Sequence, residues 1–88
     1  MNAELEQKIG EKIQETILAG GELRRVAERL STDGSESFVM GMVSGRLYNS
    51  FYYQCRRIQK RDPTPEEFVE FLDMLASNRD ALAEACRR

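Results

Sequence analysis

The sequence contains no histidine and only two cysteines. Without histidine, the usual zinc sites and the histidine-based catalytic triads are excluded. Cys55 and Cys86 are too few for a disulfide framework, and they predict reduced thiols in a cytoplasm. The longest nearly apolar run, Phe38 to Val43, is far too short to cross a bilayer, and the polar first residues do not resemble a signal peptide. We therefore expect a soluble cytoplasmic protein that holds no metal or other cofactor.

The size and composition predict one small globular domain over residues 1–88. Hydrophobic residues make up 41% of the chain and charged residues 32%, which is far from the composition of a disordered protein. A chain of this length buries only about 60–65% of its unfolded surface, so a monomer would be marginally stable and a dimer would complete its core. Because the net charge is −2, any nucleic-acid contact must come from a local basic patch.

Hydrophobic residues recur at helical spacing along the whole chain, and no segment alternates like a strand. In the first segment, Leu5 to Ile17 repeat at four-residue intervals, and Gly20-Gly21 is expected to end that helix as a left-handed cap. Thr64-Pro65, with Glu67 three residues after the threonine, predicts a capping box. The fold is therefore predicted to be all-α, a compact bundle of four to five helices with a long central one. The expected helices cover residues 3–19, 22–30, 36–61, 65–76 and 79–86.

The first half of the long helix holds a candidate seam between two copies of the chain. Its first two turns are apolar nearly all round, so we expect them to be buried on every side. Gly41 and Gly45 either seat a neighbouring helix of the same core or let the helix of a second copy approach closely. Tyr48 and Tyr52, one turn apart, would anchor such an interface. The predicted dimer seam is Gly41, Gly45, Tyr48 and Tyr52.

The second half of the long helix has a basic face. Residues 46–61 carry five positive charges and no negative one, a pattern that suits nucleic-acid phosphates or an acidic protein partner. Residues 62–75 carry five negative charges and no positive one, so the same face can instead be paired with these carboxylates across the turn. They are Asp62, Glu66, Glu67, Glu70 and Asp73, and whether Glu66, Glu70 and Asp73 cover the face is left open. The residues of the predicted basic face are Arg46, Asn49, Tyr53, Arg56, Arg57 and Lys60.

Three motifs fail on inspection. The spacing of Cys55 and Arg61 is that of cysteine-based phosphatases, but the intervening residues lie within a helix whose N–H groups are already bonded. The loop around Asp33 lacks the alternating oxygen ligands of a calcium site. Residues 24–30 resemble the first helix of a helix-turn-helix motif, but the connection that follows is too long and the next helix begins with apolar residues.

No catalytic constellation remains, so the sequence favours a small non-enzymatic protein-interaction or regulatory protein that forms a homodimer. The alternative is a nucleic-acid-binding protein that uses the basic face of the central helix.

Overall fold

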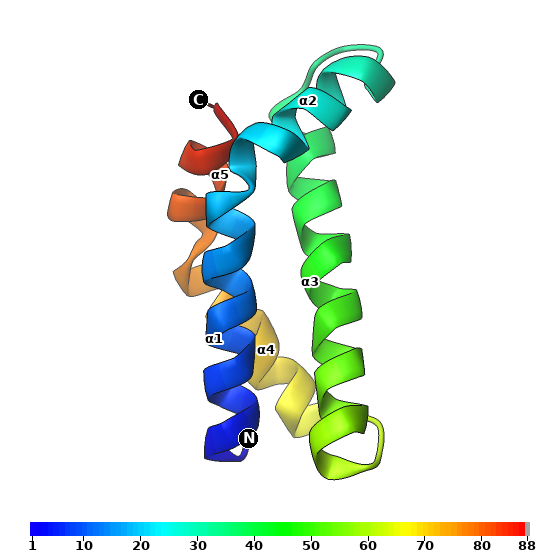
Figure 1. The fold of residues 1–88 in the computed structure, drawn as a ribbon, viewed down its shortest axis with the longest axis vertical. Coiled ribbons are helices and arrows are strands. Elements are labelled where there is room, and N and C mark those ends of the chain that lie inside the picture. Colours follow the sequence, from blue (N-terminus) through cyan, green and yellow to red (C-terminus); the bar gives the residue numbers. More distant parts are fainter. Residues whose placement is uncertain (88) are drawn as a thin grey trace.

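The computed structural model describes residues 1–87, which form five α-helices and no strand. Figure 1 shows α1 (Ala3–Leu18) and α3 (Glu36–Gln59) side by side along the length of the molecule, with α2 (Gly20–Leu30) across one end. Behind them, α4 (Pro65–Ser77) and α5 (Arg79–Arg87) return towards that end. The bundle is 39 Å long and 19 by 18 Å across. The prediction of an all-α bundle with a long central helix is confirmed.

The core lies along α1 and α3 and is closed by α4 and α5. Buried residues recur at helical spacing along α1 and form one stripe, because the same side of the helix faces the bundle at every turn. Phe51 of α3 stacks on Phe71 of α4, with ring centroids 4.4 Å apart. Each fully buried side chain of this size contributes about 1.5–3 kcal/mol. The stripe on α1 consists of Leu5, Ile9, Ile13 and Thr16.

The turn between α3 and α4 is fixed by hydrogen bonds that the sequence encodes. The predicted capping box is present: the Glu67 N–H donates to the Thr64 hydroxyl (3.1 Å), and the Thr64 N–H donates to the Glu67 carboxylate (2.9 Å). Helix α3 ends at Gln59, two residues earlier than expected. Lys60 adopts a left-handed conformation (φ 61°) and donates its N–H to the carbonyl of Arg56 (3.0 Å), which closes the helix.

The expectation that Gly20 and Gly21 cap α1 is wrong. The residue after α1 is Ala19, at φ −90°, and both glycines belong to α2. Gly20 is buried, and a Cβ atom added there would overlap the carbonyl oxygen of Ala85 in α5. A Cβ at Gly21 would meet nothing within 4 Å. Gly20 therefore lets the backbones of α2 and α5 touch, which is a tertiary role.

The expectation that the first turns of α3 are buried on every side is also wrong. Val39 and Val43 face the core, but Gly41 is exposed and Phe38 remains 37% exposed. The reason is the arrangement of the bundle: the other helices lie to one side of α3, and no element covers its outer side in Figure 1. At this end of α3, Phe38 and Gly41 are therefore open to solvent, while Met40 and Met42 are half-buried against the core.

Candidate functional site

The four residues of the predicted dimer seam lie along the outer side of α3 and form what we call the outer strip. Gly41 and Gly45 are exposed, and a Cβ atom added at either would meet nothing within 4 Å. Tyr48 is 48% exposed, and Tyr52 is half-buried. Within residues 1–87 no helix is seated on the glycines, so the alternative that they pack within the core is wrong.

The two tyrosines of the outer strip are held in place by their neighbours. Their ring centroids are 5.0 Å apart, and Tyr48 meets Phe68 of α4 edge-on at 6.3 Å. The guanidinium of Arg56 lies 5.3 Å from the centroid of the Tyr52 ring, within the range of a cation–π contact. Hydrogen bonding with Tyr48 raises the pKa of Tyr52. Rings that are already ordered lose little conformational entropy when they bind a partner.

Beside the outer strip, a groove of about 570 Å³ separates the first half of α3 from the junction of α4 and α5. An ion pair between Glu36 and Arg87 (2.6 Å) lies between this groove and a smaller hollow of about 270 Å³ against α2, since both residues line both spaces. Sequence reasoning missed the groove because its walls come from three helices that are distant in the chain. Its apolar lining consists of Met40, Val43, Leu75, Ala76, Leu82 and Ala83.

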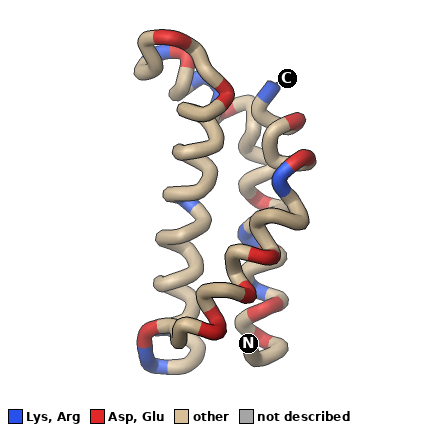
Figure 2. The backbone as a smooth tube through the Cα atoms, turned by 180° about the vertical axis from the view of Figure 1, so that it is seen from behind, with Lys and Arg blue, Asp and Glu red and all other residues tan. Residues whose placement is uncertain are grey.

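The residues of the predicted basic face lie on α3 or, in the case of Lys60, at its C-cap. Arg56 forms an ion pair with Asp62 in the turn (2.6 Å), and Figure 2 shows basic and acidic segments adjoining there. Within residues 1–87, Arg46, Arg57 and Lys60 have no carboxylate partner. Arg57 donates instead to the Gln54 side chain (3.0 Å), and Lys60 donates to a backbone carbonyl (2.9 Å). The face is therefore only partly neutralised.

Of the five acids that follow the basic face in the sequence, Asp62 and Glu67 form ion pairs with the end of α3, and Glu66, Glu70 and Asp73 do not. Glu70 binds the amino group of Met1 instead (2.7 Å), and Glu66 and Asp73 make no ion pair within the described part of the chain. The acids that do pair with the end of α3 lie in the connecting turn and on the inner side of α4. They are Asp62 and Glu67.

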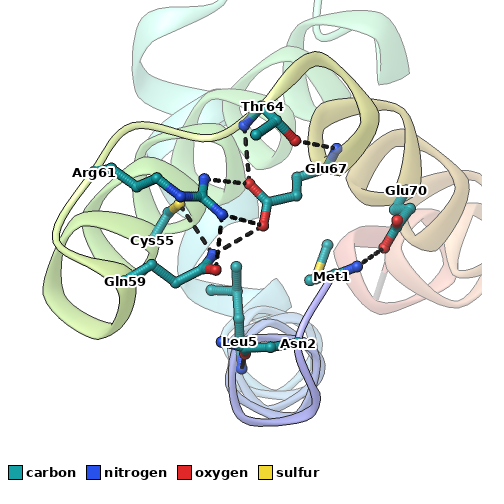
Figure 3. A network of polar contacts seen from close by, with 9 residues as sticks. All are labelled: Met1, Asn2, Leu5, Cys55, Gln59, Arg61, Thr64, Glu67 and Glu70. Carbon is teal, nitrogen blue, oxygen red and sulfur yellow. Dashed lines mark hydrogen bonds and ion pairs between the residues drawn. The ribbon is translucent and has the colours of Figure 1, made fainter.

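Glu67 is the centre of a buried polar network, shown in Figure 3. Its carboxylate, only 6% exposed, accepts two hydrogen bonds from Arg61 (2.8 and 3.2 Å) and one from Gln59 (2.9 Å). The Arg61 guanidinium, helped by the Thr64 N–H and Gln59, lowers the pKa of Glu67 to about 2. Because the carboxylate stays ionised at neutral pH, it does not supply a proton for acid catalysis. Its contacts join the end of α3 to the start of α4.

The two thiols lie in the interior of the part of the chain that the structure describes. Cys55 and Cys86 are buried and unpaired, and burial raises the pKa of both thiols. A thiol in this state is a poor nucleophile at neutral pH. Among residues 1–87, no three cysteine or acidic side chains gather where they would hold a metal ion.

Protein-family models, curated proteins and solved structures that were compared with this chain gave no match. None of the helices described over residues 1–87 is both long enough and apolar enough to cross a membrane.

Proposed function

We propose that this protein is a small non-enzymatic interaction protein that forms a homodimer through the outer side of α3. The observation that carries the proposal is the open surface at Gly41 and Gly45 beside the two ordered tyrosines. Small residues let a second helix approach closely, and tyrosines are among the strongest anchors of protein interfaces. We place the protein in the cytoplasm, which its two free buried thiols support.

Exposed apolar side chains near the outer strip support the same proposal. Phe38 is 37% exposed at the start of α3, and Leu72 of α4 is 45% exposed one turn after Phe68, which touches Tyr48. Contiguous apolar surface on a small protein is typical of a binding site for another protein. A homodimer would remove this surface from water and enlarge a core that is small for independent stability.

Sedimentation equilibrium at micromolar concentration tests the homodimer. We expect a mass of about twice the 10.1 kDa of one chain. Gly45→Leu would place a bulky side chain on the outer strip, and we expect it to give a monomer. Gly10→Leu is the matched control, because Gly10 is also a helical glycine with nothing within 4 Å of an added Cβ, but it lies on α1. A wild-type mass near 10 kDa, or a Gly45→Leu protein as dimeric as the control, would contradict the proposal.

A second candidate function, nucleic-acid binding, is favoured by the unpaired charges of the basic face. Arg46, Arg57 and Lys60 have no carboxylate partner within residues 1–87, and Tyr53, on the same face, is 60% exposed and available for stacking on a base. Phosphate contacts release counterions, so binding to labelled DNA or RNA should weaken steeply with salt. An acidic protein partner would use the same side chains.

Fluorescence anisotropy over a salt series, with duplex and single-stranded oligonucleotides, tests this second candidate. We expect Arg46→Glu combined with Arg57→Glu to abolish binding. Arg25→Glu combined with Arg29→Glu on α2 changes the net charge equally and serves as the control. If both double variants weaken binding to the same extent, the effect is one of net charge and the basic face is not the site.

A further inference from the structure

The residues on the outer side of α3 repeat at intervals of three and four. Phe38 and the four residues of the outer strip, Gly41, Gly45, Tyr48 and Tyr52, follow one another in this way. These are the intervals of the a and d positions of a coiled coil, here over two heptads. Gly41, Gly45 and Tyr48 are exposed on the side away from the core residues Val43 and Leu47, and Tyr52 is half-buried against the core. Two copies of α3 can therefore meet along a continuous seam.

When the outer strip is read in the reverse direction, its large residues fall where its small ones were, so the strip is complementary in size to a reversed copy of itself. The outer strip reads glycine, glycine, tyrosine, tyrosine from N- to C-terminus. When two such helices run in opposite directions with Gly45 opposite Tyr48 of the second copy, Gly41 falls opposite Tyr52 of the second copy. Every ring then faces a glycine. When the helices run in the same direction, each glycine faces a glycine and each tyrosine faces a tyrosine, which leaves voids beside crowded rings.

We propose that the homodimer is an antiparallel pair of α3 helices about a two-fold axis, in which the tyrosines of each copy lie on the glycines of the other. This inference rests on the homodimer proposed above and specifies its geometry. An interface of this kind is isologous, since the same surface serves both copies. In this register the two-fold axis passes between residues 46 and 47, near the middle of α3.

The charges at the two ends of α3 favour the antiparallel direction. Asp33 precedes the helix, and Arg57 and Lys60 lie at its end. None of the three has an ion pair within residues 1–87, so their charges are uncompensated in one copy. In the proposed register, the end of α3 that carries Arg57 and Lys60 lies beside the start of α3 of the second copy, which Asp33 precedes. A parallel pair would place like charges together, which is unfavourable.

The structure leaves room for a second helix. In Figure 2, α4 passes the lower end of α3 and then runs towards the other side of the bundle. Phe68 supports the Tyr48 ring from α4, and the glycines further along α3 remain open. The second copy would therefore approach next to α4 without displacing it.

A distance measurement between spin labels tests the direction of pairing. The label is attached at Arg57→Cys, an exposed position off the seam, and the buried native thiols with raised pKa react slowly. In the antiparallel register the two labels lie about 21 residues apart along the seam, which is more than roughly 30 Å at about 1.5 Å per residue. In a parallel pair they lie at the same level, about 20 Å apart, given a spacing of about 8–10 Å between helices and the length of the side chains.

The outcomes separate the two proposals. A distance above about 30 Å supports the antiparallel pair. A dimer with labels about 20 Å apart overturns the antiparallel pair and leaves the homodimer standing. A monomer in sedimentation, with no coupling between labels, overturns both.

The register is tested by mixing two variants. Gly45→Tyr places two rings opposite each other in its own homodimer, and Tyr48→Gly leaves two voids, so we expect each to raise the dimer dissociation constant at least tenfold. In a one-to-one mixture every ring again faces a glycine, and we expect affinity within about threefold of the wild type. Single variants that dimerise normally, or a mixture that does not recover affinity, would overturn the register.

Discussion

Gly20 lies where the backbones of α2 and α5 touch, and replacing it tests how tightly the bundle is closed. In Gly20→Ala the new Cβ would overlap the carbonyl oxygen of Ala85 and lie 2.6 Å from the carbonyl carbon. Backbone atoms of a helix cannot move aside as a flexible side chain can, so α5 must shift. Overpacking of this kind costs about 1–3 kcal/mol. Alanine recovers part of that through its better helix propensity, which is worth up to about 1 kcal/mol.

Gly21→Ala is the matched control, because Gly21 is the next residue of the same helix and an added Cβ there meets nothing within 4 Å. We expect Gly21→Ala to leave the free energy of unfolding unchanged or to raise it by about 0.5 kcal/mol. The free energy of unfolding of Gly20→Ala should be about 2 kcal/mol lower than that of Gly21→Ala. With an unfolding slope of about 1–1.5 kcal/mol per molar urea, the midpoints should differ by about 1–2 M. Equal midpoints in urea denaturation followed by circular dichroism would refute the close contact of α2 and α5.

Three further predictions concern stability. The Arg61 ion pair lowers the pKa of Glu67 from 4.5 to about 2, so its contribution to stability is present above about pH 4.5 and is lost as the pH falls through 2. This contribution should amount to about 3 kcal/mol. Denaturation at several pH values should show this pH dependence in the wild type and not in Glu67→Gln. Phe71→Ala should cost about 3–5 kcal/mol because the ring is fully buried, whereas Leu18→Ala should change the unfolding midpoint little because Leu18 is 86% exposed. Gly10→Ala should stabilise the protein by up to about 1 kcal/mol, and a loss in calorimetry would contradict the open space at that position.

The sequence by itself determined where the helices are. Their signals are local: the four-residue spacing that buries Leu5 and Ile9, and the capping box of Thr64 and Glu67, depend only on neighbours within a few positions. The outer strip could also be selected from the sequence, because Gly41, Gly45 and the tyrosines stand out on a helical projection. What the sequence could not tell was whether that side of α3 meets another helix of the same chain.

The tertiary structure alone decided which surfaces are open. The start of α3 is apolar nearly all round, so only the position of the other helices determines that Val39 is buried while Phe38 and Gly41 are not. The two glycines at the start of α2 look alike in the sequence, yet only Gly20 meets another backbone, that of Ala85 in α5. Such roles depend on contacts between segments distant in the chain, and no local pattern records them.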